Sequence, residues 1–276
     1  MPRDARYPAF AKKRYGQHFL IDRNVIDKIV KAAGLSPGDH VLEIGPGRGA
    51  LTEAMLEAGT SVLAVEVDAR LAEGLREVYA GRPLEVLTGD ALRISYTELA
   101  RERGVRFKAV SNLPYNISGP MLAKFLAERD AFTLMVLMFQ KEVAARIAAR
   151  PDTKEYGSLS VFSQVFTDVK IEFDVPAHLF VPRPKVTSSV VRLRVRDEPR
   201  VEVHDEAFFK SVVRSAFSTR RKMLPNALKT LGLGREEALA ALDEAGVDPS
   251  RRGETLSLEE FSALTGALIR LKGGRG

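Results

Sequence analysis

The sequence predicts an α/β protein with a mainly parallel sheet, followed by a small all-helical C-terminal domain. Three observations predict this fold class. Residues Val41–Asp68 read as a strand, a glycine-rich turn, a helix and a second strand that leads into acids. Apolar runs of strand length then alternate with helical patterns up to Phe139, which is typical of a parallel sheet. From Asp205 onward, apolar residues recur only at helical spacing.

The β-α-β unit begins with an apolar run over 41–44, which stops at a glycine. Helical spacing then continues until Gly59, and 62–65 reads as a second buried strand. Three glycines lie in the turn: Gly45, Gly47 and Gly49. Glycine lets the backbone turn tightly and approach a ligand where a Cβ would intrude. The turn is therefore a candidate ligand-binding loop, although glycines that only permit close packing of strand and helix are the alternative.

The other elements of the sheet domain follow in order. Before the first unit, a helix is predicted from about Asp22, which can cap it, to Gly34, which can end it. After the unit, we expect helices over 69–79, 96–103, 118–128 and 141–150, and strands over 84–87, 107–110, 133–139, 169–175 and 186–195. Prolines separate the last two strands, which predicts a hairpin-like end to the sheet.

A charged stretch over 196–204 separates these elements from the C-terminal helices. Those helices are expected over 206–217, 221–231 and 235–245, and a last one opens with the capping box Ser257-x-x-Glu260. We therefore expect two domains, residues 1–198 and 199–276. Within the first domain, residues 1–14 have the composition of a basic, flexible arm.

Composition narrows the functional classes. The chain contains no cysteine, which excludes a disulfide framework, and its four scattered histidines lack metal-ligand spacing. The N-terminus has no apolar core of signal-peptide length, and the longest apolar run, Leu134–Phe139, is too short to span a bilayer. We therefore expect a soluble, cytoplasmic protein with no metal and no membrane association.

Positive charge is concentrated in one part of the chain. The net charge is +6, and residues 176–230 contain twelve Lys and Arg against five Asp and Glu. This local excess predicts a polyanionic partner such as nucleic acid, because neutralising phosphates supplies much of the affinity of such complexes. A solvated basic face without a partner is the alternative.

Acidic residues indicate which ligand the glycine turn binds. Glu66 ends the second strand about twenty residues after Gly45, where an acid can accept hydrogen bonds from ribose hydroxyls. The spacing Gly45-x-Gly47-x-x-Ala50 also satisfies the fingerprint of NAD-binding proteins. Glu43 inside the first strand and Asp90 after the third favour S-adenosylmethionine instead, because methyltransferase sites resemble this arrangement.

A second motif, Asn112-Leu113-Pro114-Tyr115, follows a predicted strand and therefore lies at the carboxyl edge of the sheet. An adenine amino group is a poor nucleophile, because its lone pair is delocalised, and acceptors that bond its hydrogens favour the reactive pyramidal form. The Asn112 side-chain oxygen and the Leu113 carbonyl, which Pro114 holds extended, are two such acceptors. Tyr115 offers a face for the base. An ordinary proline turn is the alternative for the tetrapeptide alone.

Seven stretches together resemble the ribosomal RNA adenine N6-dimethyltransferase family, closest to its KsgA branch. They are Tyr15–Leu20, Glu43–Gly49, Asn112–Ser118, Gln140–Val143, Tyr156–Val161, Phe180–Val191 and Arg220–Lys222. The resemblance implies a Rossmann-like class I methyltransferase sheet in the first domain and a helical domain that positions RNA. It also implies S-adenosylmethionine-dependent dimethylation of N6 of two adjacent adenosines, in a hairpin near the 3′ end of small-subunit ribosomal RNA.

The resemblance also assigns roles to matching residues. It implies a cofactor site lined by His18, Leu20, Gly45, Gly47, Glu66, Asp90 and Asn112. Tyr115 and Phe180 would sandwich the target adenine, with a buried aromatic anchor as the alternative for Phe180. His18 departs from the family, which usually has Asn there, so a structural role is equally open. For RNA contact we expect Arg183, Lys185, Arg220, Arg221 and Lys222.

Other functions stay open at this point. The erythromycin-resistance methyltransferases act similarly on large-subunit RNA, and some relatives keep the fold as RNA-binding assembly or transcription factors without turnover. An NAD oxidoreductase is a third alternative, but the sequence offers no acid–base pair suited to hydride transfer. We expect a monomer whose partner is the immature small ribosomal subunit.

Overall fold

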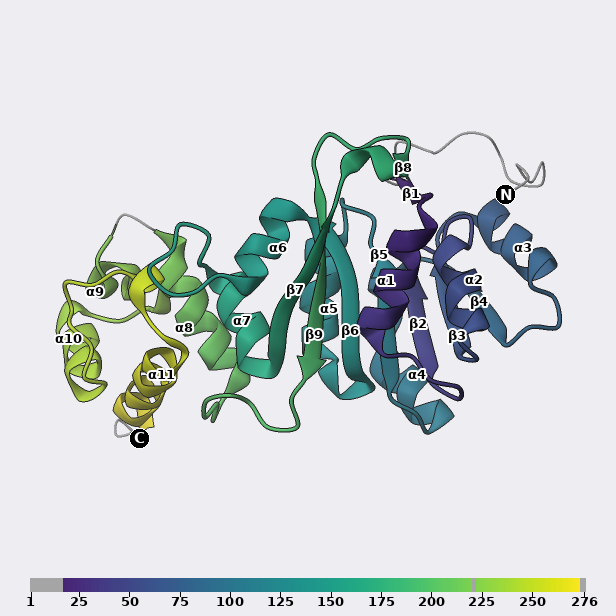
Figure 1. The fold of residues 1–276 in the computed structure, drawn as a ribbon. Helices are drawn as coiled ribbons and strands as arrows, with labels where there is room; N and C mark the ends of the chain where they lie inside the picture. The colour runs from purple at the N-terminus through teal and green to yellow at the C-terminus, as the bar shows by residue number, and fades with distance from the viewer. Residues whose placement is uncertain (1–16, 220–221, 274–276) are drawn as a thin grey trace. The chain divides into compact units, whose positions relative to one another are not determined.

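The computed structural model describes residues 17–219 and 222–273 (Figure 1). The predicted arm, 1–14, and two predicted RNA contacts, Arg220 and Arg221, lie outside the described residues. Contacts divide the chain into two compact units. The sheet unit contains the chain up to Ala144 and then Asp168–Val195, and the helical unit contains Ala145–Thr167 and the chain from Arg196 onward.

The sheet unit is built, within the described residues, on a seven-stranded sheet. Its strands are β2 (His40–Ile44), β3 (Ser61–Glu66), β4 (Leu84–Thr88), β5 (Phe107–Asn112), β6 (Phe132–Gln140), β7 (Thr167–Val175) and β9 (Ser188–Val195). Their spatial order is β4-β3-β2-β5-β6-β9-β7. The strands from β4 to β6 pair in parallel, whereas β9 runs antiparallel to β6. The predicted parallel sheet with a reversed end is confirmed.

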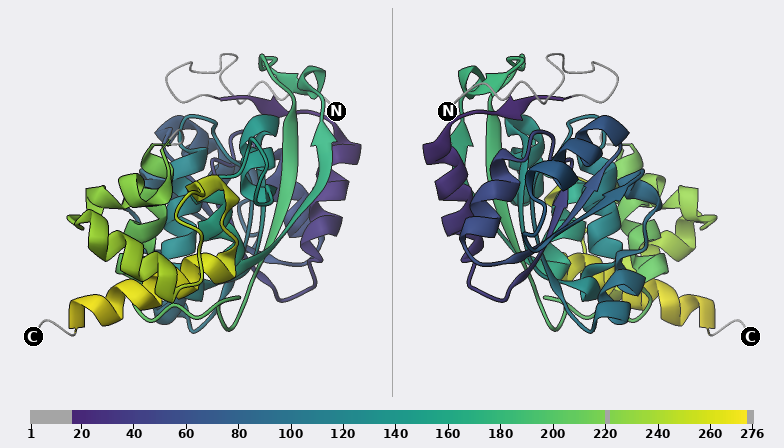
Figure 2. Two further views of the ribbon diagram at one scale, coloured as in Figure 1. Left: turned by 90° about the vertical axis from the view of Figure 1, so that its left-hand side faces the viewer. Right: turned by 90° about the vertical axis from the view of Figure 1, so that its right-hand side faces the viewer.

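Helices cover both faces of this sheet (Figures 1 and 2). One face carries α1 (Arg23–Ala33), α2 (Ala50–Glu57) and α3 (Ala69–Val78). The other face carries α4 (Tyr96–Arg103) and α5 (Ser118–Ala127). Successive side chains of a strand point to opposite faces, so strands covered on both sides read as the continuous apolar runs seen in the sequence.

The helix that leads into the sheet begins and ends where local signals predict. Asp22 Oδ1 accepts a hydrogen bond from Val25 N at 2.9 Å, which caps the first turn of α1. Gly34 follows the helix with φ of 52°, in the left-handed region that glycine tolerates best. Both predicted ends of α1 are therefore confirmed.

A small two-stranded sheet, which the sequence did not predict, lies beside the main one. Strand β1 (Phe19–Leu20) pairs antiparallel with β8 (Phe180–Val181), so that Phe19 lies opposite Val181 and Leu20 opposite Phe180. Ile21 N also donates to Leu179 O at 3.0 Å. This pairing brings the start of the described chain against the loop between β7 and β9.

The helical unit contains α7 (Ser158–Phe166), α8 (Glu206–Ser218), α9 (Leu224–Ala227), the 3-10 helix Leu228–Leu231, α10 (Arg235–Glu244) and α11 (Leu258–Gly273). The helix predicted over 221–231 is divided, within its described part, between α9 and the 3-10 helix. The capping box at the start of α11 is confirmed. Ser257 Oγ accepts from Glu260 N at 3.2 Å, and Glu260 Oε2 accepts from Ser257 N at 2.8 Å.

The division into units differs from the one expected at residue 198. The sequence assigns 145–167 to the sheet domain, because this segment lies between two of its strands. In the structure, α7 buries Val161 and Val165 in one core with Phe209 and Phe261 of the helical unit. The apolar face of a helix looks the same whichever surface covers it, so its packing partner could not be read from the segment itself.

In the described part of the chain, none of the helices has the length and apolar content of a membrane span. No group of three or more His, Asp or Glu side chains there could hold a metal ion.

Candidate active site

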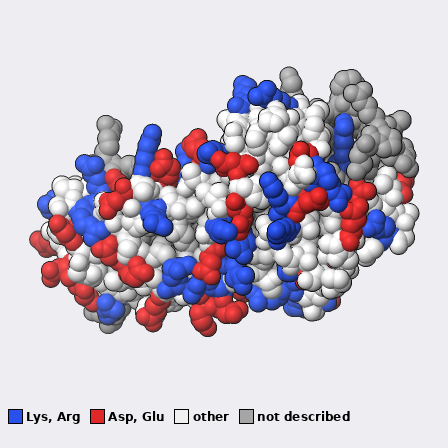
Figure 3. All heavy atoms as spheres, in the orientation of Figure 1, with Lys and Arg blue, Asp and Glu red and all other residues white. Residues whose placement is uncertain are grey.

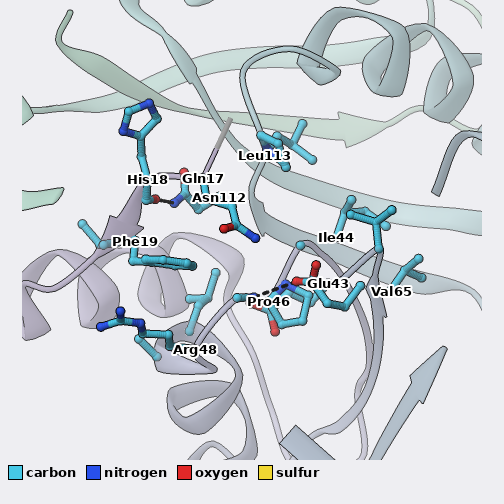
Figure 4. A pocket seen from close by; sticks show the side chains of 18 of the residues that line it. Gln17, His18, Phe19, Glu43, Ile44, Pro46, Arg48, Val65, Asn112 and Leu113 are labelled. Carbon is cyan, nitrogen blue, oxygen red and sulfur yellow. Dashed lines mark hydrogen bonds between the residues drawn. The ribbon is translucent and has the colours of Figure 1, made fainter. Parts of the chain in front are cut away.

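Most of the predicted site residues meet at the carboxyl ends of the parallel strands. The strand order reverses between β2 and β5, and ligands of open α/β sheets bind in the crevice at such a point. A cavity of about 1420 Å³ lies there, lined by the loops after β2, β3, β4 and β5 (Figure 4). Small-molecule pockets usually measure about 300–1000 Å³, so this cavity has room for a cofactor and part of a second substrate.

Two glycines of the turn line the cavity. Gly45 and Gly47 have φ of 65° and 59°. A Cβ on Gly45 would lie 3.3 Å from Pro114 Cγ, and one on Gly47 would lie 2.7 Å from a ring carbon of Phe19. A Cβ on Gly49 would instead meet a leucine of α3 at 2.8 Å. All three glycines therefore permit close packing, and Gly45 and Gly47 do so beside side chains that line the cavity.

Glu66, the last residue of β3, is a buried acid on the cavity wall. Its side chain is 3% exposed, and it accepts hydrogen bonds from Gly47 N at 3.2 Å and from Asp68 N at 2.9 Å. Burial raises the pKa of this carboxyl, although the backbone N–H groups oppose the rise. Each oxygen keeps a lone pair, so two neighbouring hydroxyls of a ligand can both find an acceptor here.

Glu43 is a second buried acid on the wall. It is 2% exposed and accepts a hydrogen bond from Thr52 Oγ1 at 2.5 Å. Burial, with a smaller contribution from the charge of Glu66, raises the pKa of Glu43 to about 8. A carboxyl with that pKa is mostly protonated at neutral pH, so the cavity does not hold two full negative charges side by side.

Asp90 lies at the β4 end of the cavity. Its Oδ1 accepts from Leu92 N at 3.0 Å and so caps the short 3-10 helix that follows. Its Oδ2 is 3.6 Å from Arg93 Nε, and the side chain is 47% exposed. These contacts fix the carboxylate at the cavity edge while leaving it able to accept a hydrogen bond from an amino group.

Asn112 ends β5, and its side-chain amide is held by the backbone of residue 18. Asn112 Nδ2 donates to His18 O at 3.0 Å (Figure 4). This bond orients the amide so that its oxygen is the atom left to accept from a ligand. Leu113 and Pro114 follow at the cavity wall, as the motif predicts.

Tyr115 also lines the cavity, and a serine anchors its hydroxyl. Tyr115 Oη and Ser188 Oγ are 2.5 Å apart, and Ser188 is fully buried at the start of β9. Ser188 pairs with Gln140 of β6, and the preceding Thr187 O accepts from Lys141 N at 3.0 Å. The hydroxyl is therefore tied to a rigid point, and burial raises its pKa so that it stays protonated.

The ring of His18 contacts the opposite loop. Its Nδ1 lies 2.7 Å from Pro182 O and carries the hydrogen, because a carbonyl can only accept. The centroid of the imidazole ring is 5.3 Å from the centroid of the Tyr115 ring, with 30° between the two ring planes. Figure 4 shows the imidazole pointing away from Pro46 and Glu43. These contacts support the structural alternative for the ring, whereas the His18 carbonyl serves the site through Asn112.

Phe180 does not take the place expected of a base-stacking residue. Its ring is 2% exposed and packs in the hydrophobic core, where its cross-strand partner Leu20 is buried too. The next residue, Val181, is 49% exposed and lines the cavity. Successive residues of a strand point to opposite sides, so one of the two must face inward, and it is the aromatic one. This placement supports the alternative, in which Phe180 is a buried aromatic anchor.

The predicted RNA contacts that the structure describes are exposed. Arg183 and Lys185 lie on the loop between β8 and β9, on either side of the buried Pro184. Figure 3 shows a group of basic side chains over this loop. Lys222 is exposed as well, in the helical unit. The loop in the sheet unit thus carries positive charge that is available to phosphates.

Three residues that shape the cavity or its contacts are not among the predicted site residues: Phe19, Arg48 and Ser188. All three lie inside stretches that carry the family resemblance, which assigns them no role. Arg48 lies within the glycine turn, and a cation in a ligand-binding loop was a signal that could have been used.

Comparisons with known proteins agree with this geometry. The family model described as ribosomal RNA adenine dimethylase matches residues 9–267. The protein named ribosomal RNA small subunit methyltransferase A from Pelotomaculum thermopropionicum is 48% identical, over 96% of this chain and 93% of its own. The protein of the same name from Geobacter metallireducens is also 48% identical, over 95% of this chain and 97% of its own.

Two solved structures share the fold over nearly the whole chain. A dimethyladenosine transferase from Plasmodium falciparum has a TM-score of 0.78 and 27% identity, covering 93% of this chain and 98% of its own. The 23S rRNA methyltransferase ErmE has a TM-score of 0.69 and 30% identity, covering 91% of this chain and 99% of its own. They confirm the expected Rossmann-like class I methyltransferase fold. By its sequence and its fold, the chain belongs to the ribosomal RNA adenine dimethylase family.

Proposed function

We propose that this protein transfers methyl groups from S-adenosylmethionine to N6 of adenosines in small-subunit ribosomal RNA. The Asn112 amide carries the proposal. Its nitrogen is engaged by His18 O, which leaves its oxygen to accept at a cavity that also contains Glu66 and the glycine turn. The relatives that are 48% identical are named for methylation of the small ribosomal subunit, and the family is named for adenine dimethylation.

The residues of the cavity fit S-adenosylmethionine. Gly45 and Gly47 expose backbone to the cavity, and a Cβ on either would press against Pro114 or Phe19, which line it too. Glu66 has a lone pair on each oxygen for the two ribose hydroxyls, and Asp90 can accept from the adenine amino group. When bound, this cofactor supplies an electrophilic methyl group on a sulfonium.

The chain's own residues act by holding the acceptor base. Asn112 Oδ1 and the Leu113 carbonyl would accept the two amino hydrogens, which would leave the nitrogen lone pair free to face the cofactor side of the cavity. Tyr115 supplies a face for the base, and Ser188 fixes that ring. Orientation and preorganised polar contacts of this kind account for large rate enhancements without a covalent intermediate.

Two successive transfers are compatible with this arrangement. A singly methylated amine keeps one hydrogen, so one of the two acceptors still holds it after the cofactor has been exchanged. The alkylated nitrogen is acidic enough to lose its proton to water, so no strong base is required. Each target adenosine would therefore carry two methyl groups on N6.

The proposal extends to substrate and domains. The sheet unit would bind the cofactor and carry out catalysis, and the helical unit would position RNA. The target would be two adjacent adenosines in a hairpin near the 3′ end, within an immature small-subunit particle, and the protein would act as a monomer in the cytoplasm. Exposed Arg183, Lys185 and Lys222 support contact with phosphates, and Arg220 and Arg221 are proposed for the same purpose.

Methylation of large-subunit RNA is a second candidate, because the 23S rRNA methyltransferase ErmE has 30% identity and a TM-score of 0.69. The 48% identity to proteins named for the small subunit favours the first candidate.

The test is to incubate the protein and S-adenosylmethionine with each ribosomal RNA and with immature small-subunit particles, and to analyse digested RNA by mass spectrometry. We expect dimethyladenosine in small-subunit RNA alone. Dimethyladenosine in large-subunit RNA alone would support the second candidate, and a product that stops at one methyl group would contradict the mechanism. Methylation of neither RNA would contradict both candidates.

A further inference from the structure

The glycine turn contains a positively charged side chain, Arg48, to which the proposed function gives no role. Arg48 lies between Gly47 and Gly49 and lines the cavity. Its Nε is buried and has no hydrogen-bond partner among the described residues. Buried side-chain donors are rarely left without an acceptor, and a charged one costs more than a neutral one. Arg48 is therefore in place for an anionic partner that the described residues do not supply there.

An aromatic ring fixes the position of this guanidinium. Arg48 Cζ lies 4.9 Å from the centroid of the Phe19 ring (Figure 4). The same ring stands against Gly47, where an added Cβ would come within 2.7 Å of it. Stacking on an aromatic face restrains the planar guanidinium but leaves its N–H edge able to bind an oxyanion. Phe19, Gly47 and Arg48 thus form a built corner of the cavity.

The order of the strands indicates which part of the ligand reaches this corner. Asp90 follows β4, Glu66 ends β3, and the Gly47 turn follows β2, which are successive neighbours in the sheet. With adenine at Asp90 and ribose at Glu66, a cofactor lying across the strand ends brings its amino-acid tail to the glycine turn. That tail ends in a carboxylate, for which arginine is a bidentate partner.

We propose that Arg48 binds the carboxylate of S-adenosylmethionine. The inference rests on the proposed function for the identity of the cofactor. It adds a specificity-determining contact at the tail of the cofactor, on the side of the cavity away from Asp90. Arg48 would therefore select for ligands that keep the amino-acid tail.

Two ligands that differ in this tail provide the test. S-adenosylhomocysteine has the carboxylate, whereas 5′-methylthioadenosine keeps the adenine, the ribose and a thioether but lacks the amino-acid end. Both are titrated by calorimetry into the full-length protein and into Arg48→Leu, which retains apolar contact with Phe19. Arg23→Leu is the matched control, because Arg23 lines the same cavity but is already paired with Asp27 at 2.8 Å and Glu57 at 2.5 Å.

We expect Arg48→Leu to lower the affinity for S-adenosylhomocysteine about 10- to 100-fold, because a charged hydrogen-bonded contact is lost. The affinity for 5′-methylthioadenosine should not change. Arg23→Leu should change neither affinity. Equal losses for both ligands, or no loss for either, would overturn the assignment of Arg48.

An unchanged S-adenosylhomocysteine affinity together with a smaller salt dependence of RNA binding would also overturn it, and would assign Arg48 to an RNA phosphate. If the unaltered protein binds neither ligand, the cofactor assignment of the proposed function fails, and the assignment of Arg48 fails with it.

Discussion

The cavity has two walls that are built in different ways. The strand-end wall consists of the loops after β2, β3, β4 and β5, and it carries Glu66, Asp90, Asn112 and Tyr115. The ribbon wall consists of β1 and β8, two strands of two residues each. They pair Phe19 with Val181, which are far apart in the sequence. The first wall follows from the sheet itself. The second depends on one long-range pairing.

The two walls differ in whether their aromatic residue lines the cavity. Tyr115 lies on the strand-end wall, where its ring lines the cavity and its hydroxyl is tied to Ser188. Phe180 lies on the ribbon wall, where it points into the core and is 2% exposed. One wall therefore presents an aromatic side chain to the cavity, and the other holds the start of the described chain in place.

The largest effect is expected from Phe180→Ala. Removal of a buried aromatic ring from a core should lower the free energy of unfolding by about 3–5 kcal/mol. The measurement is urea denaturation, with Val181→Ala as the control, because this neighbour is 49% exposed and should change stability little. Phe180→Leu should restore most of the stability and keep normal turnover. A stable Phe180→Leu enzyme with greatly reduced turnover would instead mean that the ring stacks on the base, and the comparison of the two walls would fail.

Asn112→Ala tests the strand-end wall. Loss of the amide oxygen removes one preorganised acceptor for the amino group, and turnover should fall about 100- to 1000-fold. Affinity for S-adenosylhomocysteine should change little, because Glu66 and the glycine turn are untouched. Single-turnover methylation of RNA and calorimetry measure the two effects. Normal turnover would remove Asn112 from the mechanism.

The sequence predicted the strand-end wall better than the ribbon wall for a physical reason. In a parallel sheet, residues that follow strands meet at one edge, so Glu66, Asp90 and Asn112 could be placed together without a structure. Strands of two residues have no detectable period, so β1 and β8 could not be seen, nor could the side to which Phe180 points. The same limit applies to Ser188, whose contact with Tyr115 depends on three-dimensional packing.

The buried Glu43 makes a prediction about pH. Its pKa in the folded protein is raised to about 8, above that of an unfolded glutamate, so the folded state binds more protons between these values. Its contribution to stability is complete below about pH 4.5 and is lost as pH rises towards 8. Between pH 5 and 7, cofactor-free protein should therefore lose stability on the order of 2–3 kcal/mol, since one extra proton bound by the folded state corresponds to about 1.4 kcal/mol per pH unit.

Glu43→Gln should flatten this pH dependence, because an amide does not ionise, whereas Glu98→Gln, which changes an exposed residue of α4, should not. Urea midpoints between pH 5 and 9 provide the measurement. Burial also raises the pKa of Glu66, so a weaker slope of the same sign should persist in Glu43→Gln. An unaltered slope in this variant would mean that Glu43 ionises in the folded protein as it does in the unfolded chain.

The smallest effect is expected where β9 supports the strand-end wall. Ser188→Ala removes the partner of the Tyr115 hydroxyl. A hydrogen bond of this kind contributes about 1 kcal/mol. Turnover should therefore fall about 3- to 10-fold, because the Tyr115 ring loses its fixed position. Tyr115→Phe removes the same bond, and the two changes combined should cost no more than either alone, because residues in direct contact are not additive. Ser189→Ala is the matched control, since the neighbouring hydroxyl donates to Asp174 at 2.6 Å and serves β7. RNA methylation kinetics provide the measurement. Two results would contradict the prediction: additive losses in the double variant, or a Ser189→Ala enzyme whose turnover falls as much as that of Ser188→Ala. Either result would mean that β9 acts through general stability and that the hydroxyl pair does not position Tyr115.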